Sequence, residues 1–183
     1  MKAEHAVIGR IAQGDRDAFR ELYDRYYKAV YLYAYRLLGE EAEDVANEVM
    51  MEIWKGAKRF KGRSQVSTWI FGIAANKVRK KLKKGFRSVG EEGLEEVVNG
   101  GTPPDEVSHR LQLKEKFKEA LERLSPEHRE VLHLAYYEDL SVKEISEIVG
   151  CPLNTVKTRM FYARQRLRAI LEQMGVGREA ICR

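Results

Sequence analysis

A cluster of aromatic, basic and amide side chains between residues 60 and 76 has the composition of a nucleic-acid site. A short polar loop with a glycine follows Phe60 and leads into a helical segment that carries Trp69 and Phe71. Aromatic rings stack on unpaired bases at about 1–3 kcal/mol each, and lysine and arginine neutralise phosphates. The pattern indicates single-stranded nucleic acid, with Asn76 able to read a base edge. A core role for Trp69 and Phe71, and plain solvation of Asn76, remain the alternatives.

A second candidate site lies in the last third of the chain. Ser141-Val-Lys-Glu144 forms a capping box, which opens a helix. Gly150 suits a left-handed turn, and Pro152 starts the next helix, so the unit has the layout of a helix-turn-helix. The second helix has five basic residues and no acid between positions 155 and 171. Arginine and lysine suit phosphates and guanine edges, and threonine and phenylalanine suit thymine methyl groups. The unit predicts duplex DNA binding, and the alternative is an amphipathic hairpin with a solvated basic face.

Helical periodicity predicts the elements that position the first site. Apolar residues keep a 3.6-residue rhythm up to Gly39, which suits a helix end. A second helix is expected over about 41–57, and a third begins near Ser67, with Ser67 or Thr68 as its cap.

The second site is preceded by two further expected helices. Residues 111–124 form one amphipathic helix, and Ser125-Pro126 is a strong start signal for the next. No period-two pattern persists, so the expected fold class is all-α.

Charge and glycine content divide the chain into two parts. Between Lys55 and Gly90 there are twelve basic residues and no acid, whereas Val89 to Glu106 has six acids and no base. Residues 85–106 hold five of the fourteen glycines and two of the four prolines, which is typical of a flexible linker. We therefore predict two small helical domains at 1–84 and 111–175, a flexible acidic linker at 85–110 and a tail at 176–183.

Composition excludes several classes of protein. The chain has 183 residues, a net charge of +5 and two cysteines, which argues against a disulfide scaffold or a four-cysteine zinc site. Its apolar runs fall short of the roughly 20 residues that span a bilayer, so no stable membrane insertion is expected. The four histidines are scattered, and there is no Walker loop or HExxH motif. We expect a cytoplasmic protein that is not an enzyme and has no cofactor and no metal.

The sequence, including both candidate sites, resembles the extracytoplasmic-function (group 4) sigma factors of the sigma-70 family. The resemblance runs from about Gly14 to Leu171. It rests on four segments taken in order: Ala18-Phe-Arg-Glu-Leu-Tyr23; Ala42-Glu-Asp-Val-Ala-Asn-Glu48; Ser67-Thr-Trp-Ile-Phe-Gly-Ile-Ala-Ala-Asn76; and Leu140-Ser-Val-Lys-Glu-Ile145 with Thr155-Val-Lys-Thr-Arg159. Asn47 stands where the family usually has glutamine, which has the same chemistry with a longer reach.

The resemblance implies a transcription initiation factor that binds core RNA polymerase at the beta-prime clamp and beta flap. Its first domain would be sigma region 2-like and its second sigma region 4-like. Polymerase binding is implied for Asp44, Asn47 and Glu48. Capture of flipped minus-10 bases is implied for Phe60, Lys61, Arg63, Ser67, Thr68, Trp69, Asn76, Lys77 and Lys80. Reading of the duplex minus-35 element is implied for Thr155, Lys157, Thr158, Arg159, Phe161 and Tyr162.

The resemblance also implies that promoter DNA is met both as duplex and as single strand, and that a cognate anti-sigma factor exists. The main rival is a simple helix-turn-helix regulator with an effector-binding first domain. The stretch from Lys55 to Gly90, which has basic residues and no acid, argues against that rival. An effector-binding domain does not require such a concentration of positive charge. An enzyme is the second rival, and a nuclease would need carboxylates within the basic field, which has none.

Overall fold

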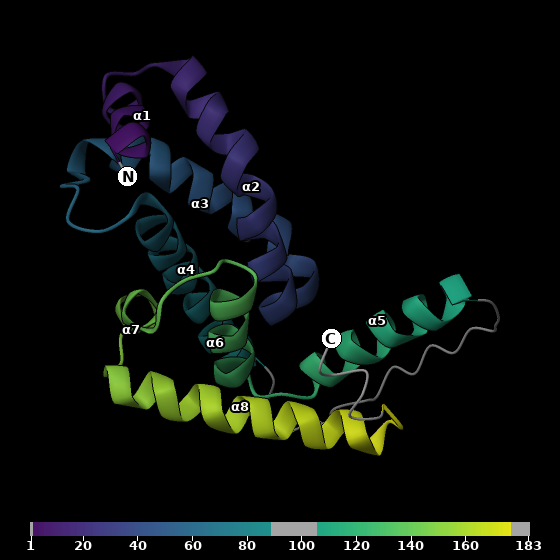
Figure 1. Ribbon diagram of the computed structural model, residues 1–183. Helices are drawn as coiled ribbons and strands as arrows, with labels where there is room; N and C mark the ends of the chain where they lie inside the picture. The colour runs from purple at the N-terminus through teal and green to yellow at the C-terminus, as the bar shows by residue number, and fades with distance from the viewer. Residues whose placement is uncertain (1, 89–105, 177–183) are drawn as a thin grey trace.

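The computed structural model of the protein describes residues 2–88 and 106–176, which form two groups of helices (Figure 1). The first group comprises α1 (Lys2–Ala12), α2 (Arg16–Leu38), α3 (Ala42–Gly56) and α4 (Val66–Ser88), with 3-10 turns at Gly39–Glu41 and Ala57–Arg59. The second group comprises α5 (Glu106–Glu122), α6 (Pro126–Tyr136), α7 (Val142–Val149) and α8 (Leu153–Gln173). The described ranges contain no strand, so the prediction of an all-α fold is confirmed.

Local signals explain where α2 begins and ends. Asp15 caps the helix, because its carboxylate accepts hydrogen bonds from the backbone N–H groups of Asp17 and Ala18 at 2.9 and 3.0 Å. Gly39 follows the last turn with φ at 68°, a conformation that glycine adopts without strain. The predicted helix end at Gly39 is therefore confirmed, and α3 confirms the second expected helix.

The helix-turn-helix is present as predicted. Ser125 caps α6, with Pro126 at its first position. Ser141 and Glu144 form both halves of the capping box at the start of α7. Gly150 ends α7 in the left-handed region at φ 68°, ψ 33°, and α8 begins directly after Pro152.

Some details differ from the sequence predictions. Helix α1 was not predicted, because no strong start signal precedes it, yet its Ile8 is buried in the core. Helix α4 begins at buried Val66, so Ser67 and Thr68 lie inside its first turn and their prediction as caps is wrong. Helices also extend into both ends of the predicted linker, with α4 reaching Ser88 and α5 starting at Glu106. The rest of that linker and nearly all of the predicted tail lie outside the described residues.

The two groups of helices pack against each other, with α7 against α4 and α6 against α2 (Figure 1). Their buried side chains form one hydrophobic cluster that includes residues of both groups, such as Phe71 of α4 and Leu134 of α6. Among the described helices, none combines the length and apolar character needed to cross a membrane.

Candidate nucleic-acid and polymerase interface

The loop between the second 3-10 turn and α4 is built around an aromatic cluster. The ring centroid of Phe60 lies 4.9 Å from that of Trp69, and both side chains are half-buried. His5 of α1 meets Phe60 edge-on at 5.3 Å, and a Cβ at Gly62 of the loop, where φ is 65°, would lie 3.4 Å from its Nδ1. Sequence reasoning missed His5, because only the fold brings α1 to this loop. The cluster fixes the loop and leaves Phe60 and Trp69 partly accessible.

Most of the other predicted minus-10 side chains lie at the surface of this loop or farther along α4. Asn76 is exposed, and its Oδ1 accepts a hydrogen bond from Arg79 Nη2 at 3.0 Å. Lys77 Nζ lies 3.1 Å from Glu48 Oε2, an ion pair that joins α4 to α3. The remaining members are exposed Lys61, Arg63 and Lys80, and half-buried Ser67.

Thr68 does not lie at this surface. Its side chain is only 4% exposed, and its hydroxyl donates to Glu144 Oε1 of α7 at 3.2 Å. In this arrangement of the two helix groups, Thr68 is covered by α7. It is therefore not accessible to DNA, which disagrees with its predicted role in DNA binding.

The three predicted polymerase contacts lie together on α3. Asp44, Asn47 and Glu48 are all exposed, while the opposite face of α3 is buried. Sequence reasoning missed the apolar groove that continues from Asn47. Met51 and Trp54 line it at 56% and 36% exposure, which is high for large apolar side chains. Exposed apolar surface next to polar contacts is typical of a protein-binding site.

The predicted recognition helix α8 presents its side chains to solvent. Phe161 and Tyr162 are 50% and 53% exposed and meet edge-on at 5.4 Å. Lys157 and Thr158 are also exposed, and the Thr158 hydroxyl donates to the Asn154 carbonyl at 2.9 Å. The other two predicted minus-35 residues, Thr155 and Arg159, are half-buried.

A buried polar network between α2 and α6 was not predicted. The Tyr33 hydroxyl donates to Glu130 Oε1 at 2.7 Å, with Tyr33 fully buried and Glu130 8% exposed. Burial raises the pKa of the Glu130 carboxyl above its ordinary value of 4.5, although the Tyr33 hydrogen bond opposes this. Burial and the neighbouring Glu130 raise the pKa of Tyr33 well above 10.0, so its phenol stays protonated as the donor.

A second pair of contacts extends the network. His133 is 2% exposed, and its Nδ1 lies 2.9 Å from Arg36 Nη1. Because a guanidinium cannot accept a hydrogen bond, Nδ1 accepts here, and Nε2 donates to Glu138 Oε1 at 3.0 Å. Burial lowers the pKa of His133, in keeping with a neutral ring. The one available sequence signal was a histidine inside the apolar run Val131-Leu-His-Leu134.

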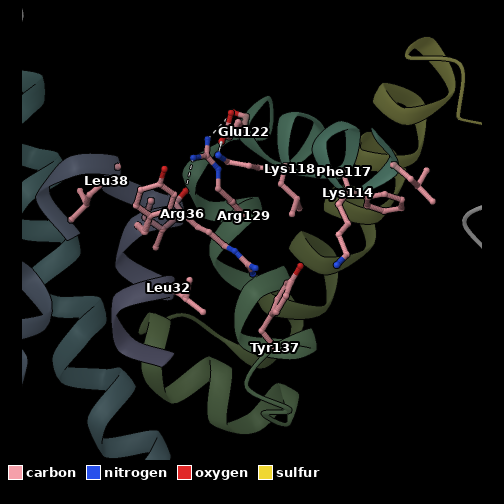
Figure 2. Close-up of a pocket in the computed structure, with 14 residues that line it drawn as sticks. Leu32, Arg36, Leu38, Lys114, Phe117, Lys118, Glu122, Arg129 and Tyr137 are labelled. Carbon is pink, nitrogen blue, oxygen red and sulfur yellow. Dashed lines mark hydrogen bonds and ion pairs between the residues drawn. The ribbon is translucent and has the colours of Figure 1, made fainter. Parts of the chain in front are cut away.

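Beside this network, a hollow of about 780 Å³ lies between α2 and α5. Figure 2 shows Arg36 reaching from α2 toward Tyr137, whose ring centroid is 3.5 Å from the guanidinium carbon. Arg129 Nη1 donates to the Arg36 carbonyl at 2.6 Å, and Arg129 Nη2 donates to the Glu122 carbonyl at 2.8 Å. Both arginines therefore hold the two helix groups together around the hollow.

Within residues 2–88 and 106–176, histidine, cysteine and carboxylate groups form no cluster of three that could hold a metal ion. Cys151 is half-buried, and its backbone carbonyl accepts from the Ser146 hydroxyl at 2.7 Å, so the residue takes part in the turn of the helix-turn-helix.

Comparison with known proteins agrees with this geometry. The family model for sigma-70 region 2 matches residues 22–87, and that for sigma-70 region 4 matches residues 120–169. The chain is 33% identical to the ECF RNA polymerase sigma factor SigW of Bacillus subtilis, over 91% of this chain and 96% of that protein. It is 32% identical to the ECF sigma factor SigL of Mycobacterium tuberculosis, over 94% and 99%.

A solved structure gives the same result. The sigma factor RpoE of Bartonella quintana, crystallised with the anti-sigma factor NepR, superimposes with a TM-score of 0.66 at 25% identity, covering 84% of this chain and 96% of that chain. Matches to both sigma-70 regions, and relatives aligned over almost their whole length, show that the chain belongs to the ECF RNA polymerase sigma factors, which are transcription initiation factors rather than enzymes.

Proposed function

We propose that this protein guides core RNA polymerase to promoters by melting the minus-10 element with its N-terminal helices and reading the minus-35 element with α8. The observation that carries the proposal is the outer face of α8. Phe161 and Tyr162 stay half-exposed there beside Lys157, on a helix whose opposite face is buried in the core at Val156 and Ala163. A recognition helix needs such a face to enter the major groove.

Melting would take place on the loop that precedes α4. A flipped base of the non-template strand would stack on the Phe60–Trp69 cluster, and Asn76 would read its edge. Stacking contributes about 1–3 kcal/mol per base. Lys61, Arg63 and Lys80 would bind the neighbouring phosphates. Base binding would supply the free energy of strand opening, so no nucleotide hydrolysis is needed.

Polymerase would bind the exposed face of α3. Asp44, Asn47 and Glu48 supply polar contacts, and the groove at Met51 and Trp54 supplies apolar area for a helix of the beta-prime clamp. The second domain would meet the beta flap. We expect the factor to act in the cytoplasm, because core RNA polymerase acts there.

We also propose an anti-sigma partner, since the related RpoE of Bartonella quintana was crystallised with one. The favoured surface is the hollow between α2 and α5, which Leu32, Phe117 and Leu121 line with apolar area. Its charged lining comprises Arg36, Lys114, Lys118, Arg129 and one acid, Glu122. This charge balance suits an amphipathic helix with acidic flanks. Leu121→Asp should then weaken the complex with the cognate anti-sigma factor at least tenfold, as measured by titration calorimetry. An unchanged affinity would show that the anti-sigma factor binds another surface.

Run-off transcription tests the main proposal. Core polymerase, the factor and fragmented genomic DNA from the source would be combined, and the 5′ ends of the transcripts sequenced. We expect discrete starts that share two upstream elements. Asn76→Ala should shift or abolish them, and Gln13→Ala, an exposed amide in the turn after α1, should leave them unchanged. Absence of starts, with no factor comigrating with core polymerase, would refute the proposed roles of these surfaces.

A further inference from the structure

We propose that α1 supports the minus-10 loop, defined as residues 60–65, and that His5 is a positioning residue that holds Phe60 ready to stack on the flipped base. The inference rests on the proposed minus-10 role of this loop. It gives a function to a helix that lies outside the residues matched by the region 2 family model, which begin at position 22. His5 acts through Phe60 and touches no nucleotide itself.

Helix α1 is anchored on both sides of His5. Ile8 and Ile11 are 1% and 2% exposed and pack into the core. Glu4 Oε1 accepts from the Tyr26 hydroxyl at 2.7 Å and lies 3.3 Å from Arg25 Nη1, which ties the start of α1 to α2. A side chain placed on such a fixed element can hold a neighbouring loop in a defined position.

The His5 ring reaches from α1 to the minus-10 loop. Its centroid lies 5.3 Å from that of Phe60 with an angle of 85° between the rings. Phe60 lies 4.9 Å from Trp69 in turn, so three rings from α1, the loop and α4 follow one another. The edge-on arrangement of His5 and Phe60 is one that aromatic quadrupoles favour. Phe60 is therefore held between a ring of α1 and a ring of α4.

The backbone turn at Gly62 fits against the same ring. Gly62 has φ at 65°, which glycine adopts without strain, and a Cβ there would lie 3.4 Å from His5 Nδ1 and 3.6 Å from its Cε1. The loop therefore passes close to the His5 ring at this turn. The flanking Lys61 and Arg63 are exposed, so the turn presents the two proposed phosphate contacts to solvent.

Packing rather than hydrogen bonding explains how His5 is used. Its Nε2 is buried and has no hydrogen-bond partner within the part of the chain that the structure describes. An unpartnered buried polar atom disfavours folding, so this nitrogen does not stabilise the loop. The contribution of His5 is the shape of its ring. A phenyl ring at position 5 should replace it, whereas a methyl group should not.

His5→Ala is the test variant and His5→Phe is the rescue. His128→Ala is the matched control, because it makes the same change at another half-buried histidine, on α6 of the other helix group. The probe is a labelled non-template oligonucleotide from a promoter mapped by the run-off experiment, titrated against polymerase holoenzyme that contains each variant. A duplex that carries the minus-35 element is titrated in parallel.

The expected effect is confined to the single strand. His5→Ala should raise the Kd for the oligonucleotide about two- to tenfold, the range that one edge-on aromatic contact supports. His5→Phe should restore the wild-type Kd, and His128→Ala should leave it unchanged. The Kd for the minus-35 duplex should be the same for wild type, His5→Ala and His5→Phe, because His5 supports only the minus-10 loop.

A double-mutant cycle tests whether His5 acts through Phe60. In a chain with Phe60→Ala, adding His5→Ala should have little further effect on the Kd for the oligonucleotide, because residues that act as a unit are not additive. In a chain with Asn76→Ala, the effect of His5→Ala should add in full. Asn76 lies on α4 and accepts a hydrogen bond from Arg79, with no contact to the His5 ring recorded.

Trp69 fluorescence reports on the loop in the free factor, without a promoter. The chain has two tryptophans, so Trp54→Phe leaves Trp69 as the only one. In that background, acrylamide should quench Trp69 more strongly in His5→Ala than in the chain with His5 or with His5→Phe. Circular dichroism should show the same helix content in all three proteins.

Three results would overturn the proposal. One is an unchanged Kd and unchanged quenching in His5→Ala. The second is full additivity of His5→Ala with Phe60→Ala, or a His5→Phe variant that binds the oligonucleotide no better than His5→Ala. The third is an equal loss of affinity for the minus-35 duplex, which would indicate a general structural defect. Failure of the proposed function would look different, because the wild-type holoenzyme would then show no preference for the oligonucleotide over one of scrambled sequence.

Discussion

Glu130→Gln should stabilise the protein at neutral pH, although it removes a charge from a hydrogen-bonded pair. Burial raises the pKa of this carboxyl above 4.5, so folding disfavours its ionised form. The contribution of Glu130 to the free energy of unfolding of the wild type is therefore largest below pH 4.5. It decreases as the pH rises through the pKa that the carboxyl has in the folded state. Glutamine stays neutral, and its amide oxygen can still accept from the Tyr33 hydroxyl.

The expected change in the free energy of unfolding follows from the shift in the pKa of Glu130. Each pH unit by which the pKa is raised corresponds to about 1.4 kcal/mol of unfolding free energy. For a chain of this length, that is about 3–6 °C in Tm. Glu130→Gln should therefore melt higher than wild type at pH 8, and the two melting curves should converge toward pH 4.5. Both proteins retain His133, whose lowered pKa makes each less stable as the pH falls below 6.5, so the difference between them isolates Glu130.

Thermal unfolding followed by circular dichroism from pH 4.5 to 8 measures the difference. The control is Glu147→Gln, an exposed glutamate on α7, for which we expect a change within about 0.5 kcal/mol at every pH. If Glu130→Gln melts below wild type at pH 8, the charged hydrogen bond outweighs desolvation and the reasoning is refuted.

Four further predictions concern the helix-turn-helix and the backbone. Lys157→Ala and Arg159→Ala should each weaken binding of the polymerase complex to minus-35 duplex and reduce the salt slope by about one, which titrations between 50 and 200 mM salt would measure; unchanged slopes would remove these residues from the DNA contact. Gly150→Ala should destabilise by about 1–2 kcal/mol, because its φ is 68°. Gly72→Ala, inside α4 with open space at its Cβ position, should stabilise by about 0.5–1 kcal/mol. Ser141→Ala should cost about 1 kcal/mol in denaturant unfolding through loss of the α7 cap, and no cost would contradict the capping role.

Local sequence signals were enough to predict most helices and the helix-turn-helix. One local signal was overlooked, because Asp15 caps α2 and was not predicted to do so. Gly39, Ser125 and Gly150 act on residues within one turn, so their effects could be anticipated without knowledge of the fold. The exposed positions of α3 and α8 also followed from helical periodicity, because a helix that buries one face presents the other.

The tertiary structure alone decided which polar residues are buried between the helix groups. Tyr33 and Glu130 are 97 positions apart, and Thr68 and Glu144 are 76 apart, so no local pattern links them. Thr68 reads from the sequence as a surface side chain of the basic field, but packing of α7 on α4 buries it. Periodicity predicts which face of a helix is apolar, and it carries no information on which distant helix covers the remaining polar face. That choice depends on the mutual fit of both helix groups, which is a property of the folded chain.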